Sequence, residues 1–245
     1  MKNLLIVIPT YREQKNILIL CKKLLSIKSL KYNLKILVVD DSDDLITQNL
    51  INSSKLKKKI YFIKRFKKSG RGSAILTGMK FFLKNKNKFM SMVEMDADLS
   101  HHPEELLRNL NFFYKTRSDL LISSRYLKKS KIINWPISRK ILSFLSNKLA
   151  KFLLQVPVSD YTNGYRIYSL KSIICCVKNC GKIGDGFIIL SEFLLNIHFK
   201  KLRISEIHST FTNRVRGESS VSRKEIINSL IGLLKLYKMK IKMSN

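Results

Sequence analysis

The chain has 245 residues, 45% of them hydrophobic, and a formal net charge of +30. This length and apolar content suit one large domain with a core, with or without an appendage. No segment reaches the roughly 18 uninterrupted apolar residues of a membrane span. The cysteines show no CxxC spacing, which favours reduced thiols in a cytoplasmic, soluble or peripheral protein. The charge indicates an anionic partner, either nucleic acid, a membrane surface or a phosphorylated substrate, although scattered surface lysines also explain it.

Short apolar runs alternate with helical segments along the chain. Strands are expected at residues 4–8, 34–39, 60–63, 89–93, 120–123, 167–168 and 204–210. Helical spacing follows most of them, including segments that begin near residues 70 and 138. Alternation of this kind predicts an α/β fold with βαβ units and a mostly parallel sheet.

Polar side chains follow three of the predicted strands. They are Tyr11 and Glu13, Asp40 and Asp41, and Asp96 and Asp98. Right-handed crossovers bring these loops to one edge of the sheet, where open α/β folds bind ligands. In an extended segment Asp96 and Asp98 point to the same side and can share one hard cation.

A glycine-rich turn precedes the helix that begins near residue 70. Gly70 and Gly72 do not form a dinucleotide fingerprint, because Ile75 stands where a third glycine would be. The pattern favours a tight turn with close helix packing over a phosphate cradle.

Four segments resemble the family 2 inverting glycosyltransferases: residues 7–13, 38–41, 70–74 and, most specifically, 95–103. Within that family the chain looks most like the dolichol-phosphate mannosyltransferases, from residue 4 to about residue 219. The resemblance implies a GT-A type nucleotide-sugar-binding fold, with residues 1–222 as the catalytic domain.

The resemblance also implies a donor site and a metal. The implied donor-binding residues are Pro9, Tyr11, Glu13, Asp40, Asp41, Asp96, Ala97, Asp98 and Arg214. Asp96 and Asp98 would hold Mg²⁺ or Mn²⁺, and the implied catalytic residues are Asp98, Arg125 and Arg214. Ser100 stands where some relatives have a glutamine metal ligand, but it also fits a helix cap before Pro103. No glycine follows the acids at 40 and 41, which leaves the nucleotide base open.

An acceptor site is expected around the helix that begins near residue 138. Arg139 and Ser143 share one helix face and can grip a phosphate together, although spacing alone favours a solvated face. The resemblance assigns Arg125, Arg139 and Ser143 to the phosphate of a polyprenyl lipid. The resemblance places residues 160–166 by the sugar and acceptor. The alternative is a structural role for this segment, with a local ion pair between Asp160 and Arg166.

Two segments near the end of the chain complete the expectations. Arg214 would meet the donor diphosphate, with Arg216 as a second arginine in a loop with a glycine hinge. Residues 223–245 form a basic amphipathic helix, which either lies in a membrane interface or docks on the protein core. The protein would then work at the cytoplasmic face of a membrane, directly or through a membrane-anchored partner.

The resulting hypothesis is transfer of mannose from GDP-mannose to a polyprenyl phosphate, with inversion. A phosphate monoester with a second pKa of about 6 is largely ionised at pH 7 and needs no general base. One alternative uses UDP-glucose or another donor. Another transfers to a sugar hydroxyl, with Asp160, Asp185 or Glu192 as the base. A nucleic-acid-binding protein is the third, and four carboxylates at one sheet edge argue against it because they repel a phosphate backbone.

Overall fold

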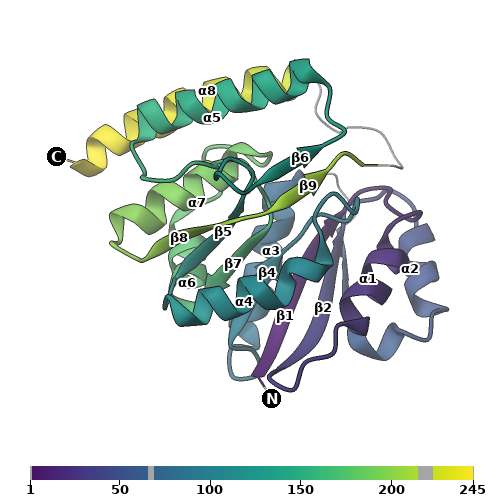
Figure 1. Cartoon of the computed structure of the whole chain (residues 1–245). Helices are drawn as coiled ribbons and strands as arrows, with labels where there is room; N and C mark the ends of the chain where they lie inside the picture. Colours follow the sequence, from purple (N-terminus) through teal and green to yellow (C-terminus); the bar gives the residue numbers. More distant parts are fainter. Residues whose placement is uncertain (1, 66–68, 215–222, 245) are drawn as a thin grey trace.

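The computed structural model describes residues 2–65, 69–214 and 223–244, with the side chains of residues 2 and 223–225 left out. A seven-stranded sheet forms its centre, in the order β3-β2-β1-β4-β7-β5-β8 (Figure 1). The strands are β1 (Lys2–Thr10), β2 (Tyr32–Asp40), β3 (Ile60–Lys64), β4 (Ser91–Glu94), β5 (Leu120–Ser124), β7 (Arg166–Ser169) and β8 (Ile204–His208). Among them β7 runs antiparallel to its neighbours β4 and β5, and the other pairs are parallel. The predicted α/β fold with a mostly parallel sheet is confirmed.

Helices cover both faces of the sheet. They are α1 (Ile17–Ser26), α2 (Ile46–Asn52), α3 (Arg71–Lys84), α4 (Leu106–Lys115), α5 (Ile137–Leu154), α6 (Leu170–Asn179), α7 (Ile188–Phe199) and α8 (Arg223–Ser244), with short 3-10 turns η1 (Lys57–Lys59) and η2 (Pro103–Glu105). Leu5 and Val7 pack in the core beside α3, α6 and α7, whereas Leu4, Ile6 and Ile8 pack in the core beside α1 and α4. A strand buried on both faces requires an unbroken apolar run, which is the pattern of β1.

The segment expected as one strand over residues 204–210 forms two strands in different sheets. After β8, the chain pairs β9 (Thr210–Thr212) in parallel with β6 (Lys131–Ile133), a short strand that the sequence pattern did not indicate. The backbone of Asn213 donates to the carbonyl of Ile133 at 2.9 Å and extends this pairing. The small sheet therefore brings the start of α5 beside the residues that follow β9.

Helices α5 and α8 pack against each other across one end of the molecule (Figure 1). Leu233 and Leu236 of α8 are buried, and Gly232 lies against Ile188 of α7. The expectation that this helix docks on the core is therefore correct for one of its faces. Both helices also expose large apolar side chains: Ile137, Ile141, Leu142, Phe144, Leu145, Leu149 and Phe152 of α5, and Ile227, Leu230, Ile231, Leu234, Tyr237, Ile241 and Met243 of α8.

Candidate active site

The carboxyl ends of the parallel strands meet at one edge, and the predicted donor residues lie there. β1 and β2 are in register through the pair Thr10 and Asp40, and β2 and β3 through Asp40 and Lys64. Asp40 accepts hydrogen bonds from Thr10 Oγ1 and Ser42 Oγ, each at 2.8 Å, and pairs with Lys64 Nζ at 2.9 Å. Because Asp40 is fully buried among these groups, it ties the three strand ends together.

Asp41 forms a second ion pair at the same edge. Arg65 binds its two oxygens through Nε and Nη2 at 2.5 and 2.6 Å, and the backbone N–H of Ser69 donates to it at 3.1 Å. Lys64 and Arg65 were not predicted as site residues. Their position directly at the end of the third predicted strand was the available signal, since the same rule selected the acids after the other strands.

The acidic pair that follows β4 is held by two arginines and a histidine. Asp96 Oδ1 receives Arg71 Nε at 2.7 Å and Nη2 at 2.6 Å, and its Oδ2 lies 3.1 Å from His101 Nε2. Asp98 accepts from the backbone of Ser100 at 3.0 Å and pairs with Arg214 Nη2 at 3.2 Å. Burial alone would raise the pKa of Asp96, but Arg71 and His101 hold that pKa well below its usual range.

Glu13 lies in the electrostatic field of this pair. Its pKa is raised, first by burial and then by the negative charges of Asp98 and Asp96, while Asn16 and Arg214 act in the opposite direction. Asn16 Nδ2 donates to Glu13 Oε2 at 2.7 Å. Of the other predicted donor residues, Ala97 is buried, and Pro9 and Tyr11 are half-buried. The carboxylates of the loops after β1 and β4 and the guanidinium of Arg214 therefore influence one another electrostatically.

Ser100 does not cap the following helix. Of the two roles considered for this residue, metal ligand and helix cap, the helix cap is therefore wrong. The residue before η2 is His102, and it makes no side-chain cap. Ser100 is instead buried, and its carbonyl accepts from the backbone of Thr212 at 3.0 Å. The His102 ring also bonds the Thr212 hydroxyl, at 2.8 Å. The acidic loop is thus fastened to β9, the strand that leads to Arg214.

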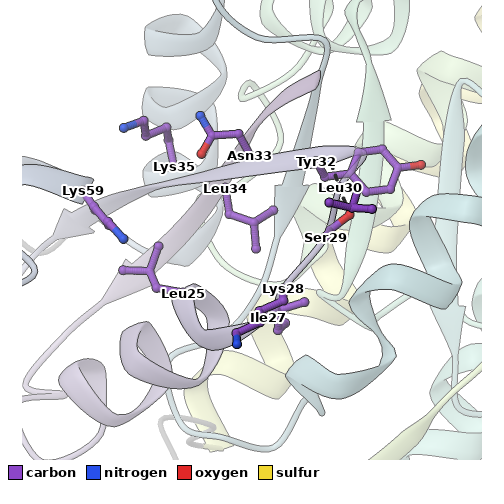
Figure 2. Close-up of a pocket in the computed structure, with 10 residues that line it drawn as sticks. All are labelled: Leu25, Ile27, Lys28, Ser29, Leu30, Tyr32, Asn33, Leu34, Lys35 and Lys59. Atoms are coloured by element: carbon purple, nitrogen blue, oxygen red, sulfur yellow. Dashed lines mark hydrogen bonds between the residues drawn. The ribbon is translucent and has the colours of Figure 1, made fainter. Parts of the chain in front are cut away.

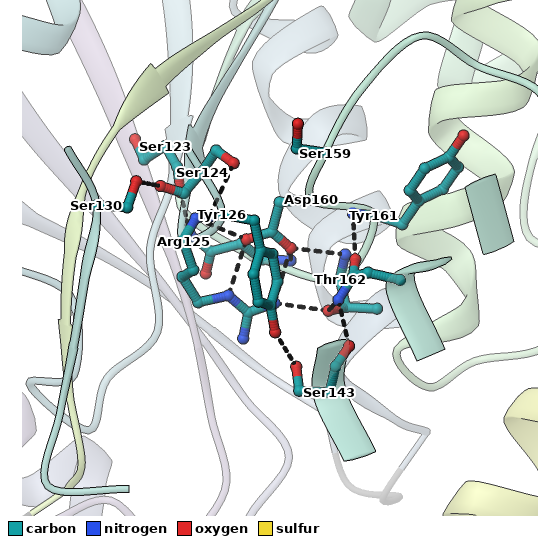
Figure 3. A network of polar contacts seen from close by, with 12 residues as sticks. Ser123, Ser124, Arg125, Tyr126, Ser130, Ser143, Ser159, Asp160, Tyr161 and Thr162 are labelled. Atoms are coloured by element: carbon teal, nitrogen blue, oxygen red, sulfur yellow. Dashed lines mark hydrogen bonds and ion pairs between the residues drawn. The ribbon is translucent and has the colours of Figure 1, made fainter. Parts of the chain in front are cut away.

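Two of the predicted acceptor residues, Arg125 and Ser143, lie in a polar network between β5 and α5 (Figure 3). Arg125 pairs with Asp160 through Nη2 and Oδ1 at 2.7 Å, and Nη2 donates to Thr162 at 2.6 Å. Ser143 accepts from the Tyr126 hydroxyl at 2.6 Å. Burial alone would raise the pKa of Asp160, but Arg125 outweighs it and lowers that pKa. Asp160 is therefore an ionised partner of Arg125.

The expected ion pair between Asp160 and Arg166 is not formed. Arg166 is fully buried, and its guanidinium donates to the backbone carbonyls of Asn163, Leu190 and Tyr161 at 2.8, 2.9 and 2.8 Å. Asp160 pairs instead with Arg125, which follows β5, the strand next to β7. This neighbour is distant in sequence, so the spacing of residues did not indicate it. The local pairing suggested by the spacing is therefore wrong.

Arg139, in the first turn of α5, contacts the residue that precedes Arg214. Its Nη1 donates to Asn213 at 3.0 Å, and its guanidinium carbon lies 4.2 Å from the centre of the buried Trp135 ring. Its pKa is lowered by burial and then by repulsion from Arg214 and Arg125. Trp135, which was not predicted as a site residue, therefore holds the Arg139 guanidinium through a cation–π contact.

Close packing accounts for the glycine-rich turn. The backbone N–H of Gly72 donates to the carbonyl of Asp185 at 2.8 Å. A Cβ on Gly70 would lie 2.5 Å from that carbonyl oxygen, and one on Gly72 would lie 2.2 Å from Ile189. The predicted tight packing of this turn, here against the loop before α7, is confirmed.

The two remaining candidate bases differ in their surroundings. Glu192 is buried and accepts from the backbone N–H groups of Gly181 and Lys182 at 2.9 and 3.4 Å, so it fastens that loop. Asp185 is exposed. Arg216 and the glycine hinge at 217 lie outside the described residues.

A separate open groove lies near the amino end of β2 (Figure 2). Its lining combines lysines with apolar side chains: Leu25, Ile27, Lys28, Ser29, Leu30, Tyr32, Asn33, Leu34, Lys35 and Lys59. Because it is at the opposite end of β2 from Asp40, none of the predicted site residues lines it.

Comparison with known proteins identifies the family. The family model described as glycosyl transferase family 2 matches residues 5–176. Polyprenol monophosphomannose synthase of Mycolicibacterium smegmatis is 32% identical over 224 residues, which cover 91% of this chain and 82% of that protein. Dolichol-phosphate mannosyltransferase of Pyrococcus furiosus is 31% identical over 236 residues, or 95% of this chain, which spans 63% of that longer protein.

Solved structures show the same fold. Glucosyl-3-phosphoglycerate synthase of Mycobacterium tuberculosis superposes with a TM-score of 0.64 over 96% of this chain and 80% of that chain, at 15% identity. Its complex with Mn²⁺ and UDP-glucose gives a TM-score of 0.63, over 96% of this chain and 79% of that chain, at 15% identity. The predicted GT-A architecture is confirmed, and the chain belongs to glycosyltransferase family 2.

Proposed function

We propose that the chain transfers mannose from GDP-mannose to the phosphate of a polyprenyl lipid, with inversion at the sugar. The names of its two relatives, a polyprenol monophosphomannose synthase and a dolichol-phosphate mannosyltransferase, support this substrate class. The observation that carries the proposal is the gathering of Arg125, Arg139 and Arg214 beside the acidic pair. Arg125 and Arg214 are balanced by Asp160 and Asp98, whereas Arg139 donates its hydrogen bond to the uncharged amide of Asn213.

Arg139 is therefore the residue best suited to an added anion. Its lowered pKa reflects burial and the repulsion of two neighbouring guanidiniums, and a bound phosphate would relieve that repulsion. The Ser143 hydroxyl lies one helical turn further along α5 and is oriented by Tyr126. Together these groups would position an ionised phosphate, which attacks without losing a proton to a base.

The surroundings of the candidate bases favour the phosphate over a sugar hydroxyl as acceptor. A general base must be able to accept a proton near neutral pH. Asp160 is committed to Arg125 with a lowered pKa, and Glu192 is turned toward the backbone of Gly181 and Lys182. Both carboxylates are therefore held by other groups of the protein, and Asp185, the third candidate, is exposed.

The acidic pair fits a divalent cation of the Mg²⁺ or Mn²⁺ class. Carboxylate oxygens are the ligands these ions prefer. The added charge would offset the repulsion from Asp98 and Asp96, which adds to burial in raising the pKa of Glu13. The described residues contain no group of three or more His, Cys, Asp or Glu side chains arranged to hold an ion, so diphosphate oxygens and water would complete the coordination. When bound, the ion would offset charge on the leaving diphosphate. Arg214 would turn from Asp98 toward the same diphosphate.

The exposed side chains of α5 and α8 would bring the lipid acceptor to this site. None of the helices that the structure describes has the length and apolarity needed to cross a bilayer. Apolar side chains interspersed with Lys148 and Lys151 on α5, and Lys235 and Lys238 on α8, suit a helix pair lying at an anionic membrane surface. Arg139 and Ser143 belong to α5, so the acceptor phosphate would be bound by the same helix that contacts the membrane.

A donor screen tests the proposal. Radiolabelled GDP-mannose, UDP-glucose and UDP-GlcNAc are each supplied with polyprenyl phosphate in vesicles and Mn²⁺. The proposal predicts label in the lipid phase with GDP-mannose. If only UDP-glucose or UDP-GlcNAc labels the lipid, GDP-mannose is not the donor. If folded protein labels no lipid with any of the three donors, the acceptor is not a polyprenyl phosphate.

A further inference from the structure

The half-buried Arg71 lies between β4 and the acidic pair. It lies in the first turn of α3, and its Nη1 pairs with Glu94 Oε1 at 2.6 Å. Its Nε and Nη2 both bind Asp96 Oδ1. The other oxygen of Glu94 accepts from the Tyr168 hydroxyl at 2.7 Å. One guanidinium thus joins a buried acid inside the sheet to the first acid of the pair.

The packing around Arg71 keeps its guanidinium in place. A Cβ on Gly164 would lie 1.9 Å from Nη2, so the glycine at this position leaves the space that the guanidinium fills. The Phe187 ring lies 5.6 Å from the guanidinium carbon on another side. An arginine side chain stays protonated over the whole pH range in which proteins are folded, and here its charge is paired with Glu94 and Asp96. Arg71 therefore carries a permanent, fixed positive charge.

The two acids of the pair consequently differ. Both oxygens of Asp96 have partners, Arg71 on one and His101 on the other. Asp98 pairs instead with Arg214, which lies at the end of the described segment and beside the predicted diphosphate position. We propose that Arg71 is a fixed internal counter-cation that positions Asp96 and weakens the affinity of the acidic pair for a divalent ion. This inference rests on the proposed use of such an ion.

A counter-cation of this kind affects the order of binding. A positive charge fixed on Asp96 repels a second cation that approaches alone. The diphosphate of a nucleotide sugar adds negative charge and offsets that repulsion. The ion would then bind together with the donor rather than before it.

Charge-matched variants of the full-length protein isolate the effect of Arg71. The experiment measures the binding of Mn²⁺ in the absence of donor and lipid. The electron paramagnetic resonance signal reports the concentration of the free ion. Glu94→Gln serves as the reference, because it keeps an acceptor for Tyr168 while removing one buried negative charge. Two double variants, Arg71→Gln/Glu94→Gln and Arg71→Met/Glu94→Gln, also remove the positive charge of Arg71. Because position 94 is then an uncharged glutamine, the loss of Arg71 leaves no unpaired carboxylate there. Thermal unfolding confirms that each variant is folded.

The inference predicts that both double variants bind Mn²⁺ on the order of tenfold more tightly than Glu94→Gln. Arg71→Lys/Glu94→Gln, which retains the charge, should stay close to the reference. Equal or weaker binding by the folded double variants would overturn the inference. No donor or lipid is present, so a failure of transfer to lipid in the donor screen leaves this result unaffected.

Discussion

Replacing Arg139 by methionine should weaken the use of the lipid acceptor while leaving the donor almost unaffected. Arg139 makes one hydrogen bond to Asn213 and stacks on Trp135, so its removal costs little folding energy. A hydrogen bond between charged groups contributes about 1.5–3 kcal/mol, and the partial exposure of Arg139 favours the lower half of that range. A loss of about 1.5–2 kcal/mol corresponds to a roughly 10- to 30-fold lower kcat/KM for polyprenyl phosphate.

The assay measures transfer of labelled sugar while the mole fraction of polyprenyl phosphate in vesicles is varied, and then while the donor is varied. Lys140→Met is the matched control, because it removes one positive charge from the same helix and therefore has the same effect on attraction to the membrane. A KM for the donor that rises as much as that for the acceptor would refute the reasoning. So would an equal loss in Lys140→Met.

Three further predictions concern folding and membrane contact. Because the pKa of Glu13 is raised in the folded protein, its ionisation destabilises the fold as the pH rises through that pKa. In the absence of metal, Glu13→Gln should therefore unfold at a higher temperature than wild type at pH 7. This difference in unfolding temperature should shrink at acidic pH. Gly164→Ala should lower the free energy of unfolding by about 3 kcal/mol or more, because a Cβ would displace Arg71 from its ion pairs. In Gly184→Ala the added Cβ meets only a side-chain methyl, so this control should lose much less. Urea titration measures both losses. Phe152→Ser, on the exposed face of α5, should reduce flotation with anionic vesicles, and unchanged flotation would remove that face from the membrane contact.

The sheet could be predicted from the sequence because its strands are short apolar runs buried on both faces. Residues at strand ends were found for the same reason: Asp40 and Asp96 follow such runs directly. β6 could not be found in this way, because it has only three residues and none of them is fully buried. It forms a strand only by pairing with β9.

The partners of the predicted site residues depend on contacts between distant segments. Arg125 and Asp160 lie 35 residues apart and meet because β5 is next to β7. Spacing alone favoured Arg166, which is nearer in sequence to Asp160. The helix faces of α5 and α8 show the same limit: periodicity identifies an apolar face, but only the structure shows that Leu233 and Leu236 dock while Leu230 and Leu234 are exposed.

The central claim is that the acceptor is a phosphate bound by Arg139 rather than a hydroxyl activated by a base. The most direct test supplies one labelled donor, GDP-mannose, with either polyprenyl phosphate or the matching unphosphorylated polyprenol, in identical vesicles with Mn²⁺. We predict label in the lipid phase with the phosphate and none above background with the alcohol. Comparable labelling of the alcohol would contradict this account, because a hydroxyl acceptor needs a general base, and the two buried candidates, Asp160 and Glu192, bind other groups.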